Sequence, residues 1–220
     1  MRGAFSIDRA RLAQRKIAER VREVDEIDFP VKHAAGVDVA YVGEKAVASA
    51  VVVEYPSLKL VEAATATVEV SFPYVPTLLA FREAWPAYRA IKSLGTPFQV
   101  LFVDGNGRLH PLKAGFACHL GVVLDKPTIG VAKKLLVGEV VEINERLGKV
   151  IYNGETLAYA IRLRGLGKRV YVSVGHKVTL ETALRLTIAF TKKNSSLPEP
   201  LIQAHSMAKK VKERLKELEA

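Results

Sequence analysis

The sequence predicts an α/β protein with a central mixed sheet flanked by helices, in which three antiparallel strands come first and parallel strands follow. Three observations support this prediction. Residues 33–70 form three runs rich in β-branched residues, joined by the short links Gly43-Glu44 and Pro56-Ser57. Two almost wholly apolar runs, FQVLFVD and PTIGVAKK, have the pattern of strands covered on both faces. Helical segments separate these later runs, which implies parallel neighbours.

The first half of the chain is predicted to hold one helix, a meander of three strands and a further helix. Apolar residues recur at roughly helical spacing over residues 8–27. The runs HAAGVDVAYV, KAVASAVVVEYP and SLKLVEAATATVEV are the three strands, and their short links imply antiparallel pairing. TLLAFREA and AYRAIKSL are helical, with Pro86 ending or restarting the helix between them and Gly95 closing it.

The second half is predicted to alternate helices with buried strands. KAGFACHLGVVLD is a helix, PTIGVAKK is a strand, and LAYAIRL and KRVYVSV are two more strands. VTLETALRLTIAFTKK and the long basic segment PEPLIQAHSMAKKVKERLKELEA are helices, and Pro200 opens the second. This order of elements, with three antiparallel strands, a helix, a parallel strand, a helix and another strand, is that of a ribonuclease H-like fold.

Length and composition limit the class of protein. The chain has 220 residues, enough for a sizeable core, and we expect residues 1–220 to form one domain. Hydrophobic residues are 49% and charged residues 25%, which excludes a disordered chain. No apolar run approaches the roughly 20 residues that span a bilayer, and the charged N-terminus lacks the apolar segment of a signal peptide. The single cysteine, Cys118, fits the reducing cytoplasm. We expect a monomer without a membrane partner.

The charge of the chain favours an anionic partner, and nucleic acid is the first choice. The formal net charge is +10 at pH 7. The alternative is a solubility charge, which is common in heat-stable proteins. We expect DNA phosphates to contact the RLRGLGKR stretch and six basic residues near the C-terminus, which are Lys192, Lys193, Lys209, Lys210, Lys212 and Arg214. The open alternative is that these residues form a solvated helix face.

Two aspartates lie on strands that this fold places side by side. In GVDVAY, Val37 and Val39 take one face of the strand while Asp38 takes the other, among small neighbours. Asp104 ends FQVLFVD. Carboxylates this close repel unless a cation lies between them, and Mg²⁺ prefers such oxygen ligands. The alternatives are a half-exposed Asp38 and a hairpin at Asp104, since DGNG is a turn signal. The following LHPLKAG lacks the alternation of a returning strand.

Several motifs resemble those of the endonuclease V family, the deoxyinosine 3′-endonucleases of DNA repair, which have a ribonuclease H-like fold. They run in the family's order from residue 36 to about 205: GVDVAY, FPYVPTLLAFRE, FVDGNGRLHPLKAGFACHLG, PTIGVAKKLL and VGHKVTLETA. Without this resemblance, Glu83, Lys133 and the histidines would be ordinary solvated or structural residues. The resemblance implies a metal-dependent endonuclease that acts on inosine-containing DNA, single- or double-stranded, with Mg²⁺ as cofactor and Mn²⁺ as a substitute.

The resemblance also implies roles for individual residues. Asp38, Glu83 and Asp104 match the metal-binding acids, Lys133 a lysine that stabilises developing charge, and His205 a histidine near the scissile phosphate; these five are the predicted catalytic residues. Tyr74 in PYVP resembles the wedge that parts the strands beside the lesion. The other predicted substrate-binding residues are the pocket walls Leu79, Gly105 and Gly115 and the nearby histidines His110 and His119.

One position departs from the family pattern. Thr77 follows PYVP, where the family leads us to expect glycine. Its side chain is expected to crowd the base pocket or to tighten the wedge turn. The glycines of DGNG are expected to let an extruded base lie close to the main chain, whose groups would then read the edge of hypoxanthine.

Alternative functions stay open at this point. They are an inosine-specific ribonuclease of the same family, another ribonuclease H-like nuclease such as a hybrid ribonuclease or junction resolvase, and a non-catalytic nucleic-acid-binding module. The number of metal ions, one or two, is equally open.

Overall fold

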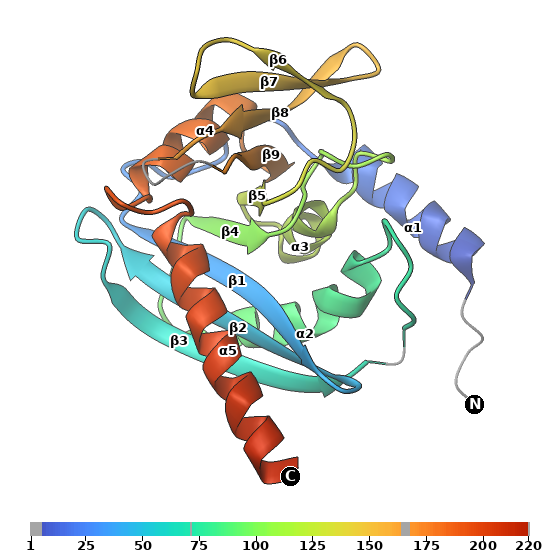
Figure 1. The fold of residues 1–220 in the computed structure, drawn as a ribbon, viewed down its shortest axis with the longest axis vertical. Helices are drawn as coiled ribbons and strands as arrows, with labels where there is room; N and C mark the ends of the chain where they lie inside the picture. The colour runs from blue at the N-terminus through green and yellow to red at the C-terminus, as the bar shows by residue number, and fades with distance from the viewer. Residues whose placement is uncertain (1–5, 71, 164–167, 220) are drawn as a thin grey trace.

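The computed structural model describes residues 6–70, 72–163 and 168–219, and these residues form nine strands and five helices. The strands make one sheet in the order β3-β2-β1-β4-β5-β9-β8-β7-β6 (Figure 1). Their bounds are β1 His33–Val42, β2 Lys45–Glu54, β3 Leu60–Glu69, β4 Val100–Asp104, β5 Thr128–Ala132, β6 Glu139–Glu142, β7 Leu147–Tyr152, β8 Glu155–Ile161 and β9 Val170–His176. The helices are α1 Ile7–Arg20, α2 Ala80–Lys92, α3 Phe116–Leu124, α4 Leu180–Ala189 and α5 Glu199–Glu219.

The sheet has the mixed pairing that the sequence predicts. β1, β2 and β3 form an antiparallel meander. β4 lies parallel to β1, with Val103 opposite Val37, and β5 lies parallel to β4. β9 returns antiparallel to β5. The first and fourth strands are therefore neighbours, as expected, and their aspartates occupy adjacent positions at one end of the sheet.

Side-chain alternation along the central strands builds one apolar core on each face of the sheet. On one face, Ala34 and Phe102 pack with residues of α4 and α5. On the other face, Ala35, Val37 and Val103 pack with residues of α2 and α3. Figure 1 shows α5 crossing β1 and β2 on the face opposite α2. By this alternation, Asp38 and Asp104 lie on the face of the sheet that α5 covers, so their carboxylates meet on that side.

Two predicted helix limits were wrong because tertiary contacts override local propensity. The helix predicted over 8–27 ends at Arg20, because the chain beyond it pairs with the loop after β9: Lys177 N–H donates to Arg22 O (2.7 Å) and Glu26 N–H to Lys177 O (3.2 Å). Pro86 neither ends nor restarts its helix, since α2 runs through it. The buried face of α2, which includes Pro86 and Ala87, packs against the sheet and holds the helix together.

The hairpin of β6 and β7 was missed by the sequence prediction. β6 is short and largely exposed, and β7 interrupts its apolar residues with Gly148 and the exposed Lys149, so neither shows the apolar alternation that marks a buried strand. A signal for β7 was nevertheless present in the next hairpin, because Asn153 and Gly154 join β7 to β8 with φ of 50° and 78°. Asn-Gly with both φ values positive is a preferred two-residue hairpin turn.

The alternative of a hairpin at Asp104 is overturned. β4 ends at Asp104 and leads through a loop into α3 rather than into a returning strand.

No helix within the described residues is both long enough and apolar enough to cross a membrane.

Candidate active site

Asp38 and Asp104 lie together at the end of the β1–β4 pair. Each aspartate follows one member of the Val37–Val103 pair, so both carboxylates leave the sheet on the side of α5. Their oxygens and a ring nitrogen of His205 all lie within 4.8 Å of one another. The two aspartate side chains are only 12% and 16% exposed. This geometry supports the predicted meeting of the two acids.

His205 comes from α5 and contacts the first of these acids. Its Nδ1 atom lies 2.7 Å from Asp38 Oδ2, while 60% of its side chain is exposed. Gly36 lets α5 approach, because a Cβ there would lie 2.3 Å from Pro200 O. The small residue beside Asp38 therefore makes room for the start of a helix, and that helix delivers the histidine.

Lys133 follows β5 and contacts the second acid. Its Nζ atom lies 2.6 Å from Asp104 Oδ2, and about half of the lysine side chain is exposed. Because β5 is parallel to β4, Lys133 emerges at the same end of the sheet as Asp104. The positive charge offsets part of the negative charge that the carboxylates bring together.

Glu83 reaches the site from α2, on the other face of the sheet. Its side chain is buried, and Tyr41 Oη donates a hydrogen bond to its Oε1 atom (3.2 Å). Burial raises the pKa of Glu83 to about 8, and the charges of Asp38 and Asp104 add to the rise. The structure brings Glu83 near the two aspartates, although the group of atoms within 4.8 Å contains His205 rather than Glu83.

The electrostatics of these acids suit a cation. Burial raises the pKa of Asp38, and repulsion from Asp104 raises it further, while His205 opposes the rise. The ionised carboxylate of Asp38 is thus destabilised by loss of water and by its acidic neighbour. A divalent cation would relieve both effects, and carboxylate oxygens are the ligands that Mg²⁺ prefers. The residues present therefore fit a divalent metal ion.

A cavity of about 160 Å³ begins at the residue after Asp104. Five of the six predicted substrate-binding residues line it: Tyr74, Leu79, Gly105, His110 and Gly115. Tyr74 is 71% exposed, as the predicted wedge role requires. The carboxylate pair and the cavity are thus joined by two successive residues at the end of β4, Asp104 and Gly105.

The sixth predicted residue, His119, is not among the described residues that line this cavity. It is buried on α3, where its ring meets Phe81 of α2 edge-on at 5.2 Å between centroids. Its Nε2 atom has no hydrogen-bond partner among the described residues. Burial lowers the pKa of His119 to about 4. The surroundings of His119 are those of a neutral, packed imidazole.

The turn formed by PYVP and Thr77 is anchored through one backbone carbonyl, Thr77 O. Gln14 Nε2 and His110 Nε2 lie 2.6 Å and 2.9 Å from Thr77 O. His110 Nδ1 accepts from Leu112 N–H (3.1 Å), so its Nε2 atom carries the proton and donates. Gln14 is fully buried and also lines the cavity, yet the sequence analysis missed it. The sequence did contain a signal, because Gln14 is a polar residue one helical turn after Ala10 and so shares the buried face of α1.

Thr77 lines the same cavity in an unusual backbone conformation. Its φ is 67°, in the left-handed region that favours glycine. The glycine that the resemblance leads us to expect at this position would adopt this conformation without strain. The hydroxyl of Thr77 donates to Pro76 O (2.5 Å), which supports the turn from within.

The glycines around DGNG serve the packing of the main chain. A Cβ on Gly107 would lie 2.1 Å from Val174 O of β9, and one on Gly115 would lie 2.3 Å from Asn106 O. At Gly105 the nearest atom would be a ring carbon of Phe116 at 3.2 Å. Close contacts between backbone segments therefore already require glycine at Gly107 and Gly115, in addition to the predicted role of such glycines beside a bound base.

The predicted phosphate contacts are described only in part. Residues 164–167 of the RLRGLGKR stretch lie outside the described residues. Lys192 pairs with Glu199 at 2.8 Å and is thereby tied to the start of α5. The lysines further along α5 are exposed or half-exposed and remain available for contacts with a partner.

Comparisons with known proteins identify the family of this chain. A family model described as Endonuclease V matches residues 15–206. The endonuclease V of Thermofilum pendens is 57% identical over 204 residues, which cover 93% of this chain and 88% of that protein. The structure of endonuclease V from Streptomyces avermitilis superposes with a TM-score of 0.88 at 36% identity, covering 99% of this chain and 96% of that chain.

A third protein was solved with nucleic acid. Ciona intestinalis endonuclease V, in complex with a 24mer DNA containing an inosine followed by a ribo-adenosine, superposes with a TM-score of 0.85 at 31% identity. The match covers 96% of this chain and 98% of that chain. With the fold, the acid cluster and the family model in agreement, the chain belongs to the endonuclease V family.

Proposed function

We propose that this nuclease recognises deoxyinosine, the product of adenine deamination, in single- or double-stranded DNA and cuts the strand nearby with Mg²⁺. In the family the cut falls at the second phosphodiester bond 3′ to the lesion and leaves 3′-hydroxyl and 5′-phosphate ends, and we expect the same products here. One observation carries the proposal: Gly105 lines the cavity while the preceding Asp104 belongs to the carboxylate pair. A base held in the cavity keeps its own strand close to the acids.

Recognition of the base is expected to use the cavity and its rim. A base extruded from its stack would enter between the wedge turn and the loop after β4, and Tyr74 would fill the space that it leaves. Hypoxanthine differs from adenine in offering an acceptor at O6 and a donor at N1. A pocket whose donors match O6 rejects adenine, because buried groups would otherwise stay unpaired.

Hydrolysis is expected to use the five predicted catalytic residues. Asp38 and Asp104, with Glu83 and His205 beside them, would hold the divalent cation, which supplies a Lewis acid and an activated water at neutral pH. The half-exposed Lys133 can exchange the carboxylate of Asp104 for a phosphate oxygen and stabilise charge that develops there. His205 Nδ1 lies on Asp38, so its Nε2 atom is left to orient water or phosphate.

The single cysteine is compatible with a reducing compartment. Cys118 is free and buried, and burial raises the pKa of its thiol to about 12, so it behaves as an inert core residue. We expect a monomer that acts in the cytoplasm.

A panel of substrates tests the proposal. Matched strands carrying one inosine in DNA or in RNA, an RNA–DNA hybrid and a four-way junction are incubated with the protein and Mg²⁺. Cutting of the inosine-containing DNA alone is the expected result. Cutting of only the hybrid or the junction would refute the proposal.

Inosine in RNA is the second candidate substrate. The DNA bound by the Ciona protein carries a ribo-adenosine directly after its inosine, and this 2′-hydroxyl beside the lesion is what makes an RNA substrate worth testing here. Faster cutting of the RNA strand than of the matched DNA strand would favour this alternative.

A further inference from the structure

We propose that one face of α5 binds the sugar–phosphate backbone of the nucleic acid, along a row formed by Lys209, Lys212 and Lys216. We call the hollow that these three lysines line the lysine groove. The inference rests on the proposed function and adds to it the path that the strand takes away from the acids. The groove starts at His205, the residue of α5 that contacts Asp38, so a strand that reaches the acids can continue onto it.

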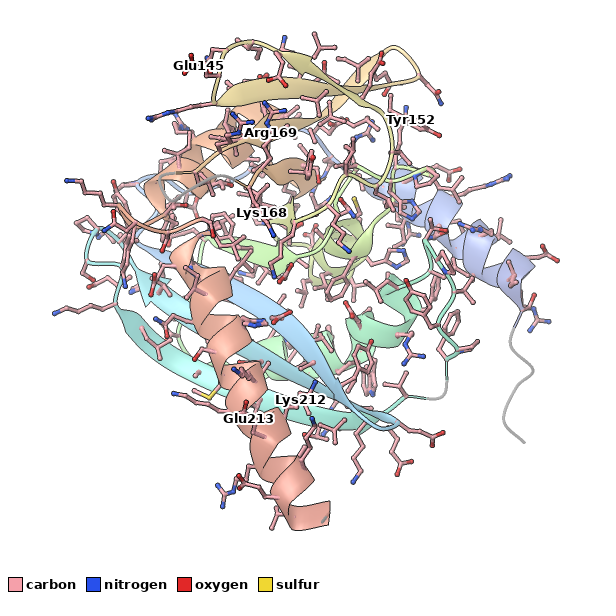
Figure 2. All side chains as sticks on the ribbon, in the orientation of Figure 1. Glu145, Tyr152, Lys168, Arg169, Lys212 and Glu213 are labelled. Carbon is pink, nitrogen blue, oxygen red and sulfur yellow. The ribbon has the colours of Figure 1, made fainter. Side chains whose placement is uncertain are left out.

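The groove is a hollow between α5 and the end of β1. It encloses about 350 Å³ and is lined by Ala40, His205, the three lysines and Glu213. Ala40 lies two residues after Asp38 on the same face of β1, so the hollow adjoins the acid cluster. Figure 2 shows Lys212 and Glu213 on the part of α5 that extends away from the start of the helix.

The spacing of the lysines places them on one stripe of the helix. Lys209, Lys212 and Lys216 follow His205 by four, seven and eleven residues, so all three fall within about 60° of one another around the helix axis. At about 1.5 Å per residue, the stripe runs about 16 Å from His205 to Lys216. A strand of nucleic acid carries a phosphate about every 3.4 Å of helix axis, so this length faces several consecutive phosphates.

The stripe is held in place, and its charge is largely uncompensated. The stripe adjoins the buried side of α5, where Ala204 and Ala208 are fully buried, so the packing of the helix fixes its position. Lys212 and Lys216 have no ion pair among the described residues. Lys209 lies 3.8 Å from Glu213, and both of these side chains are more than half exposed, so their attraction is weak. Three lysines against one glutamate leave a positive groove for a polyanion.

The three lysines lie outside the residues that the family model matches. All three lysines follow residue 206, where the match to the family model ends. The open alternative is a solvated helix face that only adds general positive charge. Lys210 and Arg214, which the sequence also led us to expect at the phosphates, allow the two possibilities to be separated. They are exposed and lie about 140° and 180° around the helix from His205, outside the groove, so the inference excludes them from the bound strand.

Two double variants with the same change in net charge provide the test. Lys209→Gln with Lys216→Gln removes two of the three lysine charges from the groove, while Lys210→Gln with Arg214→Gln is the matched control. Binding to an inosine-containing single strand and to the same strand without inosine is measured over a range of salt, without divalent cation so that the strand stays intact. Glutamine is nearly as good a helix former as lysine, so α5 is retained in both variants.

The expected result is a difference in salt dependence. Loss of two phosphate contacts should reduce the slope of log K against log salt by about 1.4 for the groove variant, equally for both strands. The control should keep a slope close to that of the wild type. Equal slopes for the two double variants would overturn the inference, whether both fall or neither does.

The acid in the groove supplies a test of opposite sign. Glu213→Gln removes a carboxylate that repels phosphate, and it should tighten binding more than Glu217→Gln, which removes the same charge outside the groove. Equal effects of these two changes would also count against the groove. Cutting of inosine-containing DNA by the wild type is scored separately. Its absence would refute the proposed function, whereas wild-type cutting with indistinguishable double variants would refute the groove alone.

Discussion

Replacing His119 by leucine is expected to make the folded state less sensitive to acid. In the native protein this imidazole is buried against Phe81 with its Nε2 atom unpartnered, and burial lowers its pKa to about 4. A histidine in the unfolded chain titrates near 6.5. Between these two values the unfolded chain binds the additional proton, so stability is complete above the higher value and is lost as the pH falls toward 4.

The magnitude follows from the separation of the two pKa values. A separation of this size corresponds to about 3 kcal/mol between neutral pH and pH 4. Leucine carries no proton and has a similar volume, so this part of the acid sensitivity should disappear in the variant. Burial also lowers the pKa values of His110 and His176, but those residues are present in both proteins and cancel in the comparison.

The assay is unfolding by denaturant at a series of pH values from about 8 to 4, for the wild type and His119→Leu. The variant should equal or exceed the wild type in stability at pH 8, and its advantage should grow by about 3 kcal/mol as the pH falls. A stability difference that does not change with pH would refute the reasoning. Cutting of inosine-containing DNA at neutral pH should persist in the variant, and its loss in a stably folded protein would restore a substrate contact for His119.

The remaining predictions concern the cavity and its supports. Tyr74→Ala should weaken binding to inosine-containing strands by about 1–3 kcal/mol, the value of one aromatic stack, and should affect undamaged strands much less; equal weakening of both would count against a wedge. Gln14→Leu removes a buried donor from Thr77 O and should lower the free energy of unfolding by about 1 kcal/mol, measured by urea titration. Gly107→Ala places a methyl group 2.1 Å from Val174 O and should destabilise the protein by about 1–3 kcal/mol, seen as a lower unfolding midpoint; an unchanged midpoint would contradict the close approach.

The sequence could predict the acid pair because the pair depends on regular structure. Alternation along GVDVAY gives the face of Asp38, and the order of elements makes its strand the neighbour of the strand that ends in Asp104. Two regular patterns therefore bring together residues that are far apart in the chain. The resemblance to the family then adds Glu83, Lys133 and His205, none of which has a distinctive local pattern.

Other features depend on how elements pack, and a local pattern cannot reveal them. The hydrogen bond from Tyr41 to Glu83 requires the position of α2 against β1, and the bond from Gln14 to Thr77 requires the docking of α1. Both pairs are distant in sequence, and their distance depends on helix placement rather than on periodicity. Pro86 shows the same limit, because the packing of α2 outweighs a residue that locally disfavours a helix.

Cleavage of a DNA strand with one deoxyinosine by the wild type and by Asp104→Asn, each with and without Mg²⁺, tests the central claim most directly. Asparagine keeps the shape of the side chain and removes the charge that would hold the cation beside Asp38. Mg²⁺-dependent cutting by the wild type, with binding retained and cutting lost in the variant, is the predicted result. Cutting by the variant at the wild-type rate, or cutting by the wild type after its divalent cations are chelated, would contradict it.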